Sequence, residues 1–126
     1  MAAYSNPVIV TFKADASITK GLAVKIGTDA DHVAKGAANT DACVGIAMST
    51  AEASGDLIEV ALVGGGAKAK VGESVVAGKL LVSHTDGTLV KANASSDRII
   101  AMAMQDGAAS DYINVVVMVA QATAAE

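Results

Sequence analysis

The sequence predicts an all-β protein whose body is built from an internal duplication and preceded by an extended N-terminal arm. Three observations support this prediction. The chain has 126 residues, which suits one compact domain. Short apolar stretches alternate with polar residues at the period of two that is typical of half-buried strands. In addition, the second half of the chain repeats the residue pattern of the first half.

The repeat divides the body into two copies. Residues 32–54 align without gaps with residues 88–110, and the matched pairs include lysine, aspartate and methionine as well as the abundant alanine. We therefore expect an arm at residues 1–16 and a single β domain at residues 17–126. Within that domain we expect the two copies at residues 17–63 and 74–119, a linker at residues 64–73 and a mobile tail at residues 120–126.

Each copy is expected to consist of strands joined by turns. The predicted strands cover residues 22–26, 44–48 and 57–63 in the first copy, and residues 80–83, 89–92, 99–104 and 112–119 in the second. The sequence His84-Thr85-Asp86-Gly87 predicts a tight turn, because Asp and Gly tolerate the backbone angles that a hairpin requires. Only residues 49–54 could hold a helical turn, with Ser49 as the N-cap.

Composition restricts the classes of partner. Hydrophobic residues make up 52% of the chain, yet only three residues are aromatic, so we expect an aliphatic core. The net charge is -4 and no segment concentrates the basic residues, which makes nucleic acid an unexpected partner. Charges or glycines interrupt every apolar run before the ~20 residues that span a bilayer, so we expect no membrane association. The absence of a signal-peptide pattern and the single cysteine, Cys43, favour assembly in a reducing cytoplasm.

The arm is the predicted partner-binding segment. A strand is expected over residues 8–13, where every second side chain would lie on one face and the free edge could pair with a strand of another chain. Two of the three aromatic residues lie in the arm, and large rings are common anchors of interfaces. The alternative is that this strand closes its own barrel. The predicted partner-binding residues are Tyr4, Pro7, Val8, Val10 and Phe12.

No catalytic, metal or cofactor site is predicted. Cys43 aligns with Ile99, which favours a small buried hydrophobic residue over a nucleophile. Neither His32 nor His84 has a histidine or cysteine neighbour at metal-ligand spacing. The glycine-rich stretches lack the spacing of nucleotide-binding motifs. We therefore expect neither enzymatic activity nor a small-molecule substrate.

Three pairs of aspartates recur in the two copies. They lie where predicted strands begin or end, a position in which aspartate side chains commonly cap turns. Turn formation is the preferred interpretation, and Ca²⁺ binding or paired-carboxylate catalysis is the alternative. The pairs are Asp29 with Asp86, Asp41 with Asp97, and Asp56 with Asp111.

Four turn-and-strand segments carry a family resemblance. They are TKGLAV at residues 19–24, VGIA at 44–47, the segment 72–78, and TDGTLV at 85–90. In this combination the chain resembles the capsid decoration, or cement, proteins of tailed bacteriophages, over about residues 17 to 119. The resemblance implies a small β-barrel or β-tulip body that binds the outside of the head shell, with an N-terminal arm that contacts the major capsid protein.

The function implied by this resemblance is structural. We expect a non-enzymatic virion protein, made in the cytoplasm of a bacterial host, that stabilises the capsid from its exterior by clamping adjacent major capsid protein subunits. We also expect a homotrimer, since linked weak contacts strengthen one another. The alternative is a recognition module on the virion surface that binds a glycan or the host, for which Tyr112 is the only ring in the body.

Overall fold

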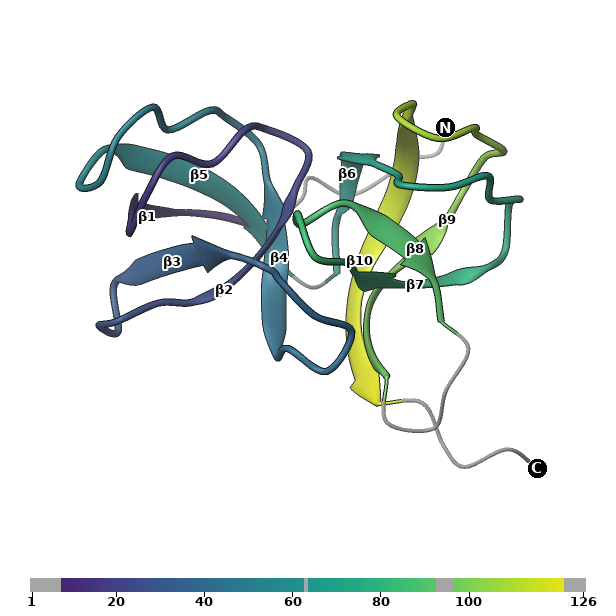
Figure 1. Cartoon of the computed structure of the whole chain (residues 1–126), viewed down its shortest axis with the longest axis horizontal. Helices are drawn as coiled ribbons and strands as arrows, with labels where there is room; N and C mark the ends of the chain where they lie inside the picture. Colours follow the sequence, from purple (N-terminus) through teal and green to yellow (C-terminus); the bar gives the residue numbers. More distant parts are fainter. Residues whose placement is uncertain (1–7, 63, 93–96, 122–126) are drawn as a thin grey trace.

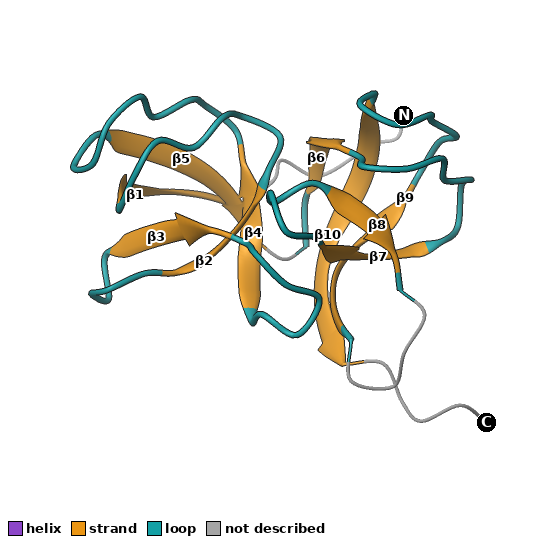
Figure 2. Cartoon of the chain, viewed as in Figure 1, coloured by secondary structure: helices purple, strands orange, loops and turns teal. Residues whose placement is uncertain are grey.

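The fold is all-β. A computed structural model describes residues 8–62, 64–92 and 97–121, which form ten strands and no helix (Figure 2). The predicted fold class is therefore confirmed. Figure 1 shows the strands in two groups of five that lie side by side, the first unit (β1–β5) and the second unit (β6–β10). Within the described residues, no helix could cross a membrane.

The first unit is a closed barrel. Its strands follow the order β1-β3-β2-β4-β5, and β1 closes the barrel because it pairs with both β3 and β5. The pairing of β1 with β3 is parallel, whereas all other pairings in this barrel are antiparallel. The strands are β1 at Ile9–Ala14, β2 at Ala23–Ile26, β3 at His32–Lys35, β4 at Cys43–Ala47 and β5 at Leu57–Leu62.

The second unit has the same strand order. Its sheet runs β6-β10-β9-β7-β8, and each antiparallel pairing has a counterpart in the first unit. A single parallel bridge between Val71 and Leu89 stands where β1 and β3 pair in the first unit. The strands are β6 at Gly66–Lys70, β7 at Leu80–Ser83, β8 at Leu89–Lys91, β9 at Arg98–Ala103 and β10 at Tyr112–Gln121.

The connections between strands repeat as well. An antiparallel bridge joins Ile18 to Ala51 in the first unit, and the same bridge joins Val75 to Gly107 in the second. The turns before β2 and β7 each contain a glycine with a left-handed φ, 91° at Gly21 and 92° at Gly78. The matching bridges and turn glycines are what a duplication of one module would produce.

The repeating unit is longer than the sequence alignment indicated. Residues 9–14, expected in an arm outside the body, form β1 and pair on both sides within the barrel. Residues 66–70, expected in the linker, form β6 as the counterpart of β1. The reason is burial: Ala14 in β1 and Ala69 in β6 are each 0% exposed.

The segment that could have held a helical turn forms no helix. It consists of bends, an isolated antiparallel bridge between Ala51 and Ile18, and a turn in which the N–H of Asp56 donates to the carbonyl of Ala53 at 3.1 Å. The Ser49 hydroxyl, considered as a helix cap, accepts a hydrogen bond of 3.0 Å from the N–H of Glu59. Pairing with a distant strand therefore overrides the local preference for a helix.

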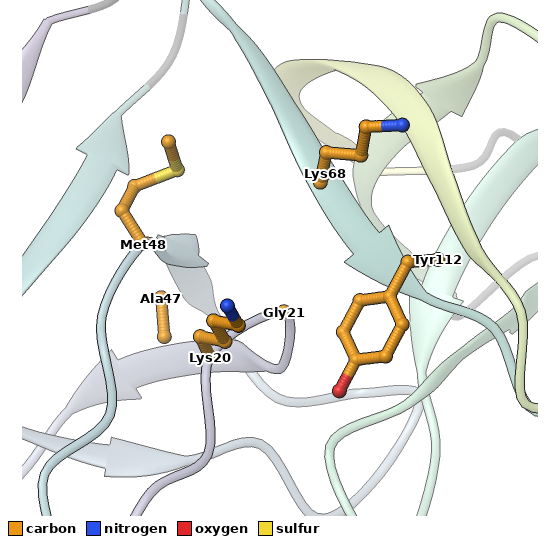
Figure 3. A pocket seen from close by; sticks show the side chains of 6 residues that line it. All are labelled: Lys20, Gly21, Ala47, Met48, Lys68 and Tyr112. Atoms are coloured by element: carbon orange, nitrogen blue, oxygen red, sulfur yellow. The ribbon is translucent and has the colours of Figure 1, made fainter.

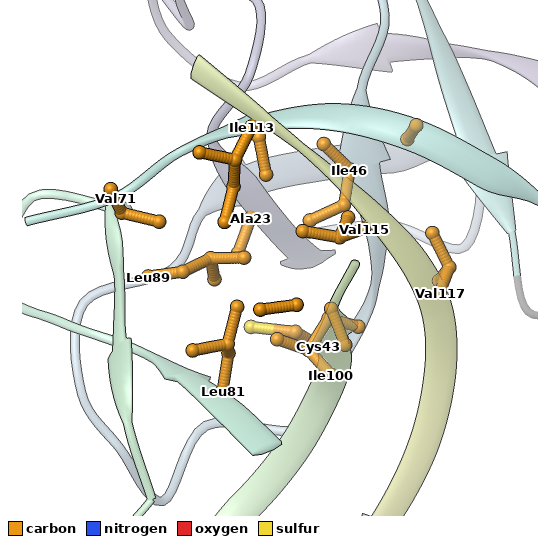
Figure 4. Packing of buried hydrophobic residues seen from close by; sticks show 14 of the residues in the cluster. Ala23, Cys43, Ile46, Val71, Leu81, Leu89, Ile100, Ile113, Val115 and Val117 are labelled. Carbon is orange, nitrogen blue, oxygen red and sulfur yellow. The ribbon is translucent and has the colours of Figure 1, made fainter. Parts of the chain in front are cut away.

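The core is aliphatic and continues from one unit into the other. One cluster of buried side chains fills the first barrel, with Val24, Val33 and Ile58 among its members. A larger cluster joins Cys43 and Ile46 of the first unit to aliphatic residues of the second (Figure 4). One side of the first barrel is thus buried against the second unit, so that the two units share a core.

Backbone hydrogen bonds also cross the boundary between the two units, which we call the seam. The N–H of Ala23 donates to the carbonyl of Gly87 at 2.9 Å, and the N–H of Lys70 donates to the carbonyl of Gly21 at 2.8 Å. These bonds satisfy backbone groups that the shared core would otherwise isolate from water. The seam is therefore fixed by polar as well as apolar contacts.

Candidate partner-binding surfaces

The residues predicted to bind a partner have different environments. Tyr4 and Pro7 lie outside the described residues. Val8 and Val10 are exposed, at 53% and 38%, whereas Phe12 is half-buried and packs against the core of the first barrel. Exposure decreases along this face because β1 enters the barrel as it approaches Ala14. Phe12 is therefore placed as a barrel residue, and the accessible apolar surface lies at the beginning of β1.

One edge of β1 is open at this end of the strand. The carbonyl of Val8 accepts a hydrogen bond from Leu62 of β5 at 2.8 Å, so the even-numbered residues direct their peptide groups toward β5. Ile9 and Thr11 direct theirs to the opposite edge. The described pairing of β1 with β3 begins only at Lys13, so no described strand covers the edge at Ile9 and Thr11.

Exposed apolar side chains surround this open edge. Val8, Ile9 and Val10 are consecutive, and Ile9 is 45% exposed. An uncovered edge offers the N–H and C=O groups that another strand can bind, and adjacent apolar side chains add area that can be buried. We refer to residues 8–11 as the β1 edge.

A partly exposed polar cluster lies where β1 and β3 pair and close the first barrel. His32 Nδ1 lies 2.9 Å from the carboxylate of Asp15, which also accepts hydrogen bonds from the backbone N–H and the hydroxyl of Thr28. The backbone hydrogen bond from Thr28 is the main reason that the pKa of Asp15 lies below its usual value, although partial burial opposes this shift. The other imidazole nitrogen of His32 lies 3.8 Å from Asp31. This arrangement orients the turn that contains Thr28.

Four of the six recurring aspartates accept hydrogen bonds from backbone N–H groups of turns, as predicted; they are Asp41, Asp56, Asp86 and Asp111. Asp56 accepts hydrogen bonds from the N–H groups of Glu52 and Ala53, and Asp111 accepts one from Ala108. In the residues that the structure describes, no three His, Cys, Asp or Glu side chains are grouped so that they could hold a metal ion.

Two further observations concern single predicted residues. Cys43 is 5% exposed within the shared core, and burial raises the pKa of its thiol. The predicted turn at residues 84–87 is present: Gly87 has a φ of 84°, and its N–H donates to the carbonyl of His84 at 3.0 Å.

A loop of the first unit, residues 36–42, holds the second unit by polar contacts. Asn39 donates its side-chain amide to the buried carboxylate of Asp97, and its carbonyl accepts a hydrogen bond from the N–H of Arg98 at 2.8 Å. The Ser83 hydroxyl donates to the carbonyl of Ala38 at 2.5 Å. A groove of about 470 Å³ with a mixed polar and apolar lining lies beside these contacts. Asp97 thus connects the two units, which its alignment with Asp41 did not indicate.

A cleft at the seam forms a second accessible surface. Its volume is about 530 Å³, and it lies between side chains of the first and the second unit (Figure 3). We call it the seam cleft and define it by Lys20, Gly21, Ala47, Met48, Lys68 and Tyr112. Sequence reasoning missed this site because its two walls come from different copies. The one available signal was Tyr112, the only aromatic residue outside the predicted arm.

Comparisons with known proteins identify the fold. No protein-family model and no curated protein matches the chain. Among solved structures, the crystal structure of the head fiber gp8.5 N base in bacteriophage phi29 is similar, with a TM-score of 0.69. The similarity covers 88% of this chain and 93% of that chain, at 18% sequence identity. The two proteins therefore share a fold over nearly their full compared lengths.

Proposed function

We propose that this chain is a non-enzymatic structural protein of a bacteriophage virion, which binds the outer surface of the capsid and stabilises it by clamping adjacent major capsid protein subunits. The observation that carries the proposal is the fold shared with the phi29 head fiber base over most of both chains. The turn-and-strand motifs that resemble phage capsid decoration proteins support it independently. In this proposal the protein is made in the cytoplasm of the bacterial host and assembles onto the capsid exterior, and it acts as a homotrimer.

The β1 edge is the proposed contact with the major capsid protein. An extended segment of the capsid protein would pair with the outward N–H and C=O groups of Ile9 and Thr11. Val8 and Val10 would add apolar contacts, and Tyr4 and Pro7 precede them in the chain. Phe12 supports this surface from inside the barrel.

A proline at position 11 tests this contact. Thr11→Pro removes the outward N–H and retains the barrel pairing, because the neighbouring even-numbered residues make the hydrogen bonds to β5. We expect Thr11→Pro to weaken binding to capsids at least about tenfold, the effect of losing about 1.4 kcal/mol. Thr11→Val is the matched control, since it changes the side chain and keeps the N–H.

Binding is measured by co-sedimentation with capsids that lack the protein, and folding by thermal unfolding. The proposed contact is wrong if Thr11→Pro melts like Thr11→Val and binds capsids equally well.

An alternative function is recognition of a glycan or a host surface. The exposed ring of Tyr112, which is 42% exposed, is the observation in its favour, because sugars often pack on aromatic faces. The cleft residues beside this ring are lysines and a methionine, with no second ring among them. We therefore prefer the capsid-binding function, and specific capture of the protein on a glycan array would reverse this preference.

A further inference from the structure

We propose that the seam cleft binds an acidic polypeptide segment that carries an apolar side chain. This inference goes beyond the proposed capsid contact, because none of the six residues that define the cleft belongs to β1. The ligand is identified by its chemistry: carboxylates for the rim of the cleft and one aliphatic side chain for its interior.

The interior of the cleft is apolar and open to a side chain. Met48 lies on the wall formed by the first unit, and Tyr112 lies on the wall formed by the second (Figure 3). Ala47 and Gly21 contribute further surface without polar side-chain atoms. A volume of about 530 Å³ is within the range in which proteins enclose small ligands or single anchoring side chains.

The Tyr112 ring is held in place before any ligand binds. A Cβ atom added to Gly21 would lie 2.5 Å from the Cε2 atom of this ring, so the ring packs directly on the glycine backbone. The N–H of Lys70 donates to the carbonyl of Gly21 at 2.8 Å and fixes the two units at the same point. A rigid, half-exposed aromatic side chain loses little conformational entropy on binding and is a typical anchor.

The rim of the cleft is positively charged. Lys20 and Lys68 line it, and Lys70 lies opposite Tyr112 in the pairing of β6 with β10. Among the described residues, none of these three lysines forms an ion pair and no acidic side chain lines the cleft. This local positive charge contrasts with a net charge of -4 for the whole chain. A carboxylate partner would therefore be attracted to this cleft over the rest of the acidic surface.

Single-stranded nucleic acid fits the cleft less well. It would need several rings for base stacking, whereas Tyr112 is the one ring among the described residues that line the cleft. The apolar interior and the cationic rim instead fit a segment of another protein.

The test uses the full chain and a short fluorescein-labelled peptide in which aspartates flank a single leucine. Fluorescence anisotropy should show binding that weakens as salt is raised, because the charges on the rim are exposed. The double variant Lys20→Gln, Lys68→Gln should bind about tenfold more weakly. Tyr112→Ala should also weaken binding about tenfold, and replacing the leucine of the peptide by glycine should have a similar effect.

The matched control is Lys79→Gln with Lys91→Gln, which removes two exposed lysines outside the cleft and should leave binding unchanged. Three results would overturn the proposal. The first is that the control variant weakens peptide binding as much as the Lys20, Lys68 variant does. The second is that a short oligothymidylate binds more strongly than the peptide. The third is that the Lys20, Lys68 variant loses self-association, which would identify a second copy of this chain as the occupant.

Discussion

Gly21 is constrained both by its left-handed backbone and by the Tyr112 ring, whereas its counterpart Gly78 is constrained by its backbone alone. Gly21 and Gly78 have the same left-handed backbone, but an added Cβ contacts Tyr112 only at Gly21, and at Gly78 nothing lies within 4 Å. Gly78→Ala should therefore lower the free energy of unfolding by about 1 kcal/mol, from backbone strain alone. Gly21→Ala should lower it by about 1 to 3 kcal/mol more, because the ring must move. Urea denaturation gives the comparison, and equal losses would contradict the packing of the ring on Gly21.

Carboxylates whose pKa is lowered in the folded protein make its stability depend on pH. Hydrogen bonds from Thr28 lower the pKa of Asp15, and the Thr88 hydroxyl lowers that of Asp86. Each contributes stability that is fully present above the unfolded pKa of about 3.9 and is lost as the pH falls through the lower folded pKa. Urea midpoints should therefore decrease below about pH 4, and Asp15→Asn should flatten this decrease. Parallel pH profiles for the two proteins would show that Asp15 has no such role.

Predictions for single residues succeeded where the environment of the residue depends on its neighbours in the sequence. The turn at residues 84–87 follows from residues that tolerate its backbone angles, and the burial of Cys43 follows from its alignment with Ile99. The environments of Phe12 and Tyr112 depend instead on long-range contacts. Alternation along β1 predicted which residues share a face with Phe12, but it could not show that this face becomes the barrel interior.

At the scale of elements, the sequence predicted β1 and most strands of the two copies. It missed β3 and β6, and it did not show that β1 and β6 are counterparts. β1 reads IVTFKA and β6 reads GAKAK, so their common role is not visible as a sequence match. What they share is a small buried residue, Ala14 or Ala69, and pairing with the last strand of the same unit. Pairing across the barrel determines this role, and an alignment does not record it.

Truncation separates β1 from the segment before it. A chain that starts at Val8 should melt at the same temperature as the full chain, because it keeps every described strand. A chain that starts at Ser17 loses β1 and exposes the core around Ile58 and Val60, which pair with it. We expect this shorter chain to unfold or to lose its cooperative transition in circular dichroism. Cooperative melting of the shorter chain would show that β1 is an arm and not part of the barrel.

At the scale of the whole molecule, the two units behave as one folded body with two separate accessible surfaces. The shared core and the backbone hydrogen bonds at the seam fix the β1 edge relative to the seam cleft. A rigid body can hold two neighbouring proteins at a defined spacing, which is what a clamp on a capsid requires. In the proposed function, this body is attached to the outside of a phage head.

Electron cryo-microscopy of phage particles assembled with and without the protein tests this attachment. We expect additional density on the outer surface of the particles that contain the protein, into which three copies of the two-unit body fit at each site with β1 facing the shell. Particles whose exteriors are identical with and without the protein, or density confined to the inside of the shell, would contradict it.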